Sequence, residues 1–101
     1  MTSPLSPAKR KQQILDAAVD RARDHGYMSI TRSEVATAAG VSTGLVNKYY
    51  STFPQLKRAV MRAAIQREIL EIIAQGLTAK DPQAFKAPDE LKKRAVDSIL
   101  G

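Results

Sequence analysis

The chain has 101 residues, enough for one domain with a modest core, and its 16 Lys and Arg against 10 Asp and Glu give a formal net charge of +6. With no cysteine, one histidine and no stretch near the ~20 apolar residues that span a bilayer, the composition excludes a disulfide framework, a thiolate metal site and a membrane-spanning helix. Residues 1–7 also lack the apolar centre of a secretory signal peptide. We therefore expect a cytoplasmic protein that needs no cofactor.

The excess positive charge is confined to the first part of the chain. Residues 1–62 hold ten Lys or Arg and four Asp or Glu, a net of +6, whereas residues 63–101 hold six of each, a net of zero. A basic segment joined to a neutral one is typical of a nucleic-acid-binding part joined to something else, although a basic surface can also serve solubility alone. The charge indicates a function only if a motif accompanies it.

The first eight residues are rich in Ser and Pro, which predicts a flexible arm over residues 1–8. A helix is predicted from Pro7 to about Asp24, where apolar residues recur at spacings of three and four, and Gly26 is expected to end it with a positive φ. Three consecutive basic residues near its start could contact a phosphate backbone or form an ordinary solvated run: Lys9, Arg10 and Lys11.

A second, shorter helix is predicted after Thr31. Thr31 and Glu34 have the spacing of a capping box, in which the threonine hydroxyl accepts from the Glu34 backbone N–H and the carboxylate reaches back to the Thr31 N–H. Gly40 is expected to break this helix after about two turns, and Ser42 to cap the next helix, which runs to about Tyr50. Two short helices joined by a tight turn have the geometry of a helix-turn-helix.

Residue types inside this motif match its steric needs. Ala36 is small where the two helices pass closely, and Gly40 can adopt a positive φ in the turn. Val41 and Val46 are placed to pack across the cap of the second helix. The second helix of such a motif enters the major groove, and the residues predicted to face DNA there are Ser42, Thr43, Gly44, Asn47, Lys48 and Tyr49. Contacts with the flanking phosphate backbone are predicted for Thr31, Arg32 and Ser33.

Two of these side chains carry the expected base-reading chemistry. Asn47 can pair with adenine through two hydrogen bonds, and Lys48 can reach guanine or a phosphate. Purely structural interpretations stay open beside the functional ones. Thr31 and Ser42 cap helices with or without DNA, and Tyr49 can be a core aromatic.

The second half of the chain predicts two further helices. Thr52 opens a helix expected to be the longest of the chain and to reach about Gln75, with Gly76 as its stop, and Pro88 precedes a final amphipathic helix. The fold class is therefore all-α: a three-helix DNA-binding domain over residues 9–53, then a long fourth helix and a short C-terminal helix within residues 54–101. Seven apolar residues of this second part are assigned to a dimer interface, although each could equally close the core of the monomer: Ile65, Ile69, Ile72, Ile73, Leu91, Ile99 and Leu100.

A string of residues across roughly positions 9–62 matches a known pattern: Ile14-Leu15-Asp16-Ala17-Ala18, Gly26-Tyr27, Thr31, Val35-Ala36, Ala38-Ala39-Gly40-Val41-Ser42, Gly44, Val46, Tyr49-Tyr50 and Leu56. This segment resembles the DNA-binding domain of the TetR family of bacterial repressors. The resemblance implies a three-helix head, a long connecting helix and a homodimer that represses transcription from a palindromic operator. The chain departs from it in the first helix, where Arg21 and Ala22 replace large apolar residues, and at two expected backbone contacts. Asn47 stands where members usually carry a phosphate-contacting tyrosine, and Phe53-Pro54 where they usually carry a lysine.

Chain length sets the remaining expectations. Members of that family are about twice as long, and the roughly 39 residues after Arg62 cannot enclose a pocket of the usual ~300–1,000 Å³, so we predict no small-molecule effector. No nucleophile–base pair or Gly-rich phosphate loop is visible, so we predict no enzyme activity. The main prediction is a repressor that binds double-stranded DNA as a homodimer. The alternative is a helical protein-interaction module, derived from such a head, that has lost specific DNA binding.

Overall fold

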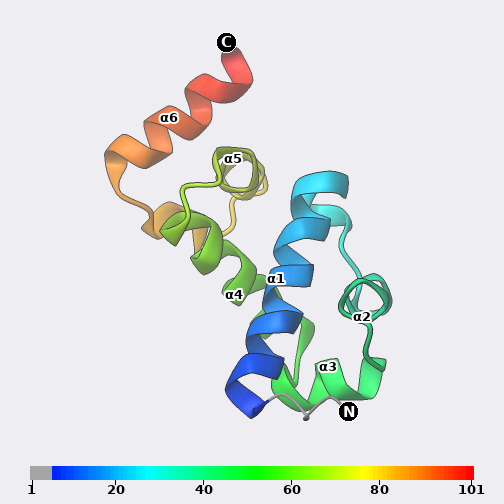
Figure 1. Ribbon diagram of the computed structural model, residues 1–101. Helices are drawn as coiled ribbons and strands as arrows, with labels where there is room; N and C mark the ends of the chain where they lie inside the picture. The colour runs from blue at the N-terminus through cyan, green and yellow to red at the C-terminus, as the bar shows by residue number, and fades with distance from the viewer. Residues whose placement is uncertain (1–5) are drawn as a thin grey trace.

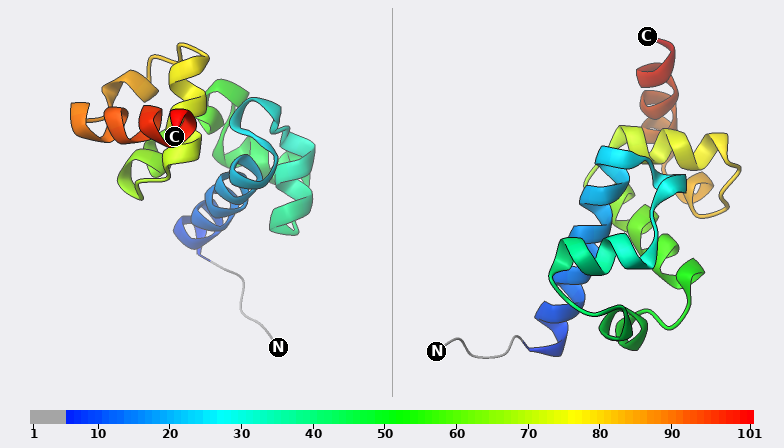
Figure 2. Two further views of the ribbon diagram at one scale, coloured as in Figure 1. Left: turned by 90° about the horizontal axis from the view of Figure 1, so that it is seen from above. Right: turned by 90° about the vertical axis from the view of Figure 1, so that its right-hand side faces the viewer.

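Six α-helices and two short 3₁₀ helices make up residues 6–101, the part of the chain that the computed structural model describes (Figure 1). In chain order they are α1 (Pro7–His25), η1 (Tyr27–Ser29), α2 (Arg32–Ala39), α3 (Thr43–Tyr49), α4 (Phe53–Gln66), α5 (Leu70–Thr78), η2 (Ala84–Lys86) and α6 (Asp89–Leu100). These residues contain no strand, so the predicted all-α class is confirmed. The molecule measures 48 × 21 × 21 Å, with α3 near one end and α6 at the other, as the further views in Figure 2 also show.

Helix α1 begins earlier than the predicted arm allows. Ser6 is its N-cap and accepts a hydrogen bond from the Lys9 N–H at 3.2 Å, and Pro7 occupies the first turn, where its missing N–H costs nothing. The arm predicted over residues 1–8 is therefore corrected at its end, because Pro7 and Ala8 are helical. The rest of that prediction, residues 1–5, lies outside the described residues. Gly26 ends the helix with the predicted positive φ, at 100°.

The core of the head is built on α1. Ile14, Ala18 and Ala22 are fully buried on one face of this helix, and α2 and α4 both pack against it. Val35 from α2 and Leu56 from α4 are also fully buried. Small residues on α1 let the neighbouring helices approach closely, so a short helix such as α2 can be held by packing rather than by its own length.

The turn between α2 and α3 has the predicted glycine geometry. Gly40 has φ 72° and ψ 32°, the left-handed conformation that favours glycine. Its N–H donates to the carbonyl of Thr37, and the Val41 N–H donates to the carbonyl of Ala36 at 2.9 Å. This pair of hydrogen bonds is a Schellman motif, which ends α2 and turns the chain into α3.

The single helix predicted over residues 52–75 is wrong. The chain instead forms two helices, α4 and α5, and the longest helix is α1, with 19 residues against 14 in α4. Glu68 adopts φ 55°, its N–H donates to Ile65 O at 3.3 Å, and the Ile69 N–H donates to Ala64 O at 2.8 Å. A second Schellman motif therefore reverses the chain here, at a residue that is not glycine.

Gly76 lies inside α5 and is not the predicted helix stop. A Cβ atom at this position would clash with Met61 Cε and would lie 2.8 Å from Ala84 Cβ. Glycine is needed because α5 passes directly over α4 and η2 at this point, and a side chain would hold the backbones apart. The helix ends two residues later, and Lys80 takes the left-handed conformation at φ 58°.

Tyr27 connects the head to the C-terminal part. Its ring is buried, and its hydroxyl donates to the Asp81 carboxylate and lies 3.2 Å from the Lys57 carbonyl oxygen. Its backbone N–H donates to the side-chain oxygen of Gln75. One residue thus joins η1, α4, α5 and the segment before η2. Burial and the Asp81 carboxylate both raise the pKa of the Tyr27 hydroxyl, which keeps it a neutral donor.

The apolar residues assigned to a dimer interface divide into three groups. Ile72, Ile73 and Leu91 are buried inside the described chain, so for these three the interface assignment is corrected to a core role. Ile65 and Ile69 are half-buried against the core. Ile99 and Leu100 are exposed, at 60% and 79%. Residues of α6 that sequence periodicity alone places on one inner face therefore have different environments.

Candidate nucleic-acid interface

Helix α3 packs on the core through one face and exposes the other. Ser42 caps it by accepting from the Leu45 N–H at 3.1 Å, and Val46 is fully buried beneath it. Tyr50, which follows the last residue of α3, is also buried. Because a seven-residue helix is marginal alone, this cap and this packing are what hold it in place.

The residues predicted to contact DNA are mostly accessible. Exposed are Lys9, Lys11, Thr31, Ser33, Ser42, Thr43, Gly44, Asn47 and Lys48. Half-buried are Arg10, Arg32 and Tyr49, the last of which packs against the core. The C-terminal helix α6 lies at the far end of the molecule and does not cover α3 (Figures 1 and 2).

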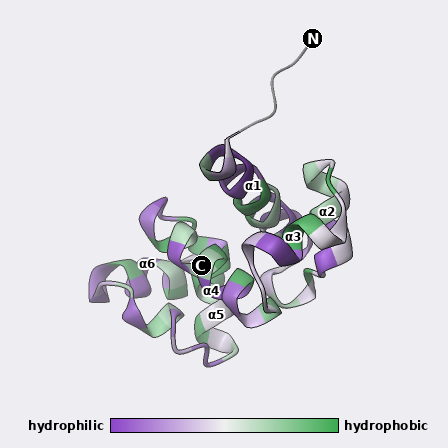
Figure 3. Ribbon diagram, turned by 90° about the horizontal axis from the view of Figure 1, so that it is seen from below, coloured by the Kyte–Doolittle hydropathy of each residue, from purple (hydrophilic) through white to green (hydrophobic). Residues whose placement is uncertain are grey.

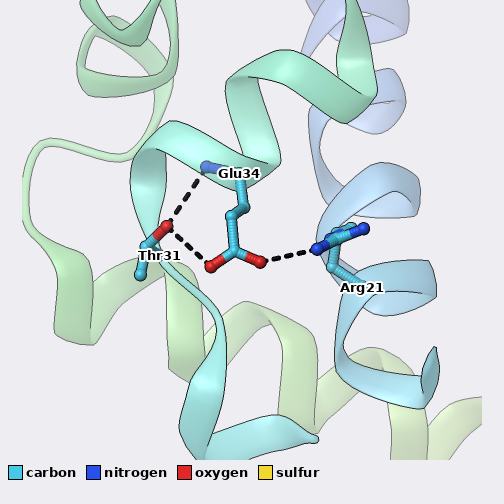
Figure 4. Close-up of polar contacts among 3 residues, drawn as sticks. All are labelled: Arg21, Thr31 and Glu34. Carbon is cyan, nitrogen blue, oxygen red and sulfur yellow. Dashed lines mark hydrogen bonds and ion pairs between the residues drawn. The ribbon is translucent and has the colours of Figure 1, made fainter. Parts of the chain in front are cut away.

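The start of α2 is anchored to α1 (Figure 4). The Thr31 hydroxyl accepts from the Glu34 N–H at 3.1 Å, as the predicted capping box requires. The Glu34 carboxylate does not reach back to the Thr31 N–H. It accepts from the Thr31 hydroxyl at 3.1 Å and from the Arg21 guanidinium at 2.6 Å. The hydrogen bond from Arg21, followed by that from Thr31, lowers the pKa of Glu34 below its ordinary value.

A second contact from α1 supports the turn of the motif. The Gln13 amide donates to the backbone carbonyl of Ala39 at 3.0 Å, one residue before Gly40. Together with the ion pair between Arg21 and Glu34, it ties both ends of α2 to α1. The position of α3 within the head therefore depends on Gln13 and Arg21 of α1, which are far from α3 in sequence.

A hydrogen bond crosses between the two helices of the motif on the outer surface. The Arg32 guanidinium, at the first residue of α2, donates to Asn47 Oδ1 on α3 at 2.8 Å. Nearby, Lys48 Nζ lies 5.7 Å from the centre of the Tyr49 ring. Two predicted DNA contacts, Arg32 and Asn47, are thus hydrogen-bonded to each other in the free protein.

The cations around α3 have no carboxylate partner. Within residues 6–101 the ion pairs are Arg21–Glu34, Arg23–Glu71, Arg67–Asp16, Lys92–Asp89 and Arg94–Glu68. None of them involves Lys9, Arg10, Lys11, Arg32, Lys48, Arg58 or Arg62. Figure 3, which views the α3 end of the molecule, shows that the first turns of α1 and part of α3 are strongly hydrophilic. This end of the protein therefore carries cations that no ion pair within residues 6–101 neutralises.

A groove between α1 and α4 extends this basic surface. It has a volume of about 600 Å³, and its walls include Lys11, Arg58 and Arg62 beside the rings of Tyr49 and Tyr50. Lys11 Nζ lies 5.3 Å from the centre of the Tyr50 ring. None of the described residues lining the groove is acidic. Sequence reasoning missed Arg58 and Arg62, and their spacing of four on one face of the predicted helix was the available signal.

Other kinds of site find little support in the described chain. Within residues 6–101, no three His, Asp or Glu side chains are grouped so as to hold a metal ion. No helix in that range combines the length and the apolar character needed to cross a bilayer.

Comparisons with known proteins identify the same segment. The sequence profile of the family described as "Bacterial regulatory proteins, tetR family" matches residues 14–60. The HTH-type transcriptional regulator BetI of Klebsiella pneumoniae strain 342 is 36% identical over 92 residues, covering 91% of this chain and 43% of that regulator. BetI of Rhizobium meliloti strain 1021 is 32% identical over 79 residues, covering 78% of this chain and 38% of that regulator. No solved structure matches the chain at a significant level.

The family profile covers the head, whereas the alignments with the curated relatives extend beyond it. The chain spans about two fifths of the length of the curated relatives it matches. The matched family consists of regulatory proteins rather than enzymes, in line with the prediction that the chain has no enzyme activity. With its capped α2–Gly40–α3 unit and the profile match over residues 14–60, the helix-turn-helix head of this chain is a head of the kind found in the tetR family of bacterial regulatory proteins.

Proposed function

We propose that this protein is a transcriptional repressor that binds a specific double-stranded DNA site as a homodimer. Residues 9–53 serve as the DNA-binding part, and residues 54–101 connect and dimerise the heads. The curated relatives are transcriptional regulators by name, which supports the same role for this chain. Such a protein works in the bacterial cytoplasm, where the chromosome lies.

The observation that carries this proposal is the exposed polar face of α3. Thr43, Gly44, Asn47 and Lys48 are exposed, while Val46 on the opposite face is fully buried. A helix held in this way can enter the major groove without rearrangement. Asn47 then pairs with adenine, and Lys48 reaches guanine or a phosphate.

The unpaired cations around α3 supply the sequence-independent part of binding. Lys9, Arg10 and Lys11 lie in the first turns of α1, at the same end of the molecule as α3, and Lys11 lines the groove that holds Arg58 and Arg62. Thr31 and Ser33 are exposed at the start of α2, whose first residue, Arg32, contacts Asn47 on α3. Each phosphate neutralised by Lys or Arg makes log K fall with log salt by a slope of about 0.9.

Selection of bound sites from random double-stranded DNA tests the proposal directly. We expect a site with two symmetric half-sites whose centres lie about 34 Å apart. Asn47→Ala and Lys48→Ala, each shown to be folded, should weaken binding to it by about 1–3 kcal/mol, and loss of a base contact should relax preference at one base pair. If no sequence is enriched and binding does not depend on salt, the chain is instead the protein-interaction module that lacks specific DNA binding.

Dimerisation is proposed through the exposed apolar residues near the C-terminal end. Phe85, Val96, Ile99 and Leu100 are exposed, and a hollow of about 400 Å³ lies among Leu77, Phe85 and Val96. A second copy seated here would leave both α3 helices free, because α6 and α3 are at opposite ends. Sedimentation of the parent and of Ile99→Glu at micromolar concentration tests this. A parent that stays strictly monomeric with and without DNA rules out the dimer.

We also propose that the chain represses without a small-molecule effector. The described hollows lie between helices at the surface, and the largest is the basic groove between α1 and α4. A reporter gene under the selected site should be silenced by the protein under all growth conditions tried. Release of the site by a dialysable cell component would contradict this proposal.

A further inference from the structure

The hydrogen bond between Arg32 and Asn47 restricts one of the two residues expected to read bases. A planar asparagine amide has an acceptor oxygen and a donor nitrogen, and it reads adenine only when each faces its proper partner. In the free protein the Arg32 guanidinium donates to Asn47 Oδ1 at 2.8 Å. The Nδ2 group is then turned away from Arg32, and Oδ1 keeps one lone pair for a second donor.

The guanidinium is available for this contact because the carboxylate on the same helix is engaged elsewhere. Glu34 accepts from Arg21 at 2.6 Å and from the Thr31 hydroxyl at 3.1 Å. Arg32 forms no ion pair within residues 6–101, and it is half-buried while Asn47 is exposed. The charged donor, Arg32, is therefore half-buried at the start of α2, and the neutral amide that it holds, Asn47, is exposed on α3.

We propose that Arg32 is a specificity-determining positioning residue, which holds the Asn47 amide in the one orientation that matches adenine. This inference rests on the proposed function, because it concerns the same DNA site. It also changes the role expected for Arg32 from its sequence position, which was contact with the phosphate backbone. Asn47 touches the base, and Arg32 acts through it.

The size of the effect follows from the freedom that the hydrogen bond removes. A helical asparagine has two common χ1 wells and two amide orientations, roughly four states, so release of the amide should lower affinity for the preferred site about fourfold. Affinity for a site with the contacted adenine replaced should hardly change, because that complex does not use the orientation. Loss of Asn47 itself removes the whole base contact, roughly a 5- to 150-fold loss of discrimination.

The test compares Arg32→Ala, Arg32→Lys, Asn47→Ala and the double variant. Binding is measured on the selected site and on the same site with a different base pair at the position where Asn47→Ala loses preference. We expect Arg32→Ala to lower discrimination at that position about fourfold and nowhere else. The double variant should discriminate no worse than Asn47→Ala alone, since Arg32 acts only through Asn47. Arg32→Lys keeps a donor and should recover part of the loss.

Two readouts separate this role from simpler ones. A phosphate contact by Arg32 predicts equal loss on both sites and a salt slope lower by about 0.9, with Arg32→Lys as good as the parent. A purely structural role predicts a lower melting temperature and equal loss on both sites. Either pattern overturns the inference while leaving the proposed function intact. A parent without any sequence preference overturns both.

Discussion

Replacement of Gly76 by alanine separates the observed α4–α5 arrangement from a continuous fourth helix. In a straight, exposed helix the change would stabilise the protein by about 0.5–1 kcal/mol, because glycine is a poor residue in a helix interior. In the structure, the new Cβ would clash with Met61 Cε and lie 2.8 Å from Ala84 Cβ. The two arrangements therefore predict changes of opposite sign in the free energy of unfolding.

The expected net effect is a loss of stability. Met61 has a flexible end, but its side chain is fully buried, and Ala84 Cβ is fixed to the backbone of η2. Overpacking of this kind costs about 1–3 kcal/mol, against the gain of about 0.5–1 kcal/mol in helix propensity. We expect Gly76→Ala to lower the free energy of unfolding by about 1–2 kcal/mol, a fall in Tm of about 4–8 °C for each kcal/mol.

Urea unfolding at equilibrium, followed by circular dichroism, measures this difference. Gly44→Ala is the matched control, because a Cβ there would meet only the Ser42 Oγ at 3.7 Å, and it should be neutral or stabilising. The clash predicts coupling as well. In a Met61→Ala background the extra cost of Gly76→Ala should shrink but not vanish, because the contact with Ala84 Cβ remains. A Gly76→Ala variant more stable than the parent would refute the close packing of α5 on α4.

Three further changes test other parts of the structure. Lys80→Gly relieves a non-glycine φ of 58° and should add about 0.5–1 kcal/mol to the unfolding free energy, whereas Gly40→Ala at φ 72° should remove about 1 kcal/mol, both measured by urea unfolding. Glu34→Gln should be less stable than the parent at pH 7. The lowered pKa of Glu34 stabilises the parent above the ordinary carboxyl value, so the difference should fade in acid melts as pH drops through the lowered pKa; a constant difference would count against the ion pair. Tyr27→Phe removes the hydroxyl that donates to Asp81 and should cost about 1–2 kcal/mol in thermal unfolding, with an unchanged Tm arguing against this junction.

The parts of the fold that sequence predicted well are those fixed by residues three or four positions apart. Ser6, Thr31, Ser42 and Thr52 each accept from a backbone N–H three residues on. Gly40 takes the left-handed conformation that its place after a short apolar face indicated. Such features depend on local spacing alone, so the sequence around them contains the whole signal.

The break between α4 and α5 depends on distant contacts, and no local signal marks it. Glu68 and Lys80 both adopt a left-handed conformation that glycine would accept more easily. The cost at Glu68 is offset because the reversal lets Ile72 and Ile73 enter the core, where both are fully buried. Gly76 misled the prediction for the same reason, since its small size serves helix packing and not a helix end.

The candidate site was predicted in part for a comparable reason. The outward face of α3 follows from helical periodicity once the helix-turn-helix is recognised. The hydrogen bond between Arg32 and Asn47 and the groove that brings Lys11 near Arg58 need the angles between helices. Periodicity within one helix says which residues face outward, and only packing says which residues of different helices meet.

The distribution of ion pairs bears on the uneven distribution of charge between the two ends of the molecule. An exposed ion pair contributes only about 0–1 kcal/mol, so pairing or not pairing a surface cation changes stability little. Arg23, Arg67 and Arg94 nevertheless have carboxylate partners, whereas Lys48 and Arg62 near α3 have none within residues 6–101. Some lysines of the C-terminal part are unpaired as well, but residues 63–101 hold as many Asp and Glu as Lys and Arg. Unpaired cations repel one another, and that cost is offset when a polyanion supplies the missing negative charge. The charge asymmetry along the sequence thus becomes a spatial one, and the end of the protein with α3 is the end at which a DNA backbone would gain most.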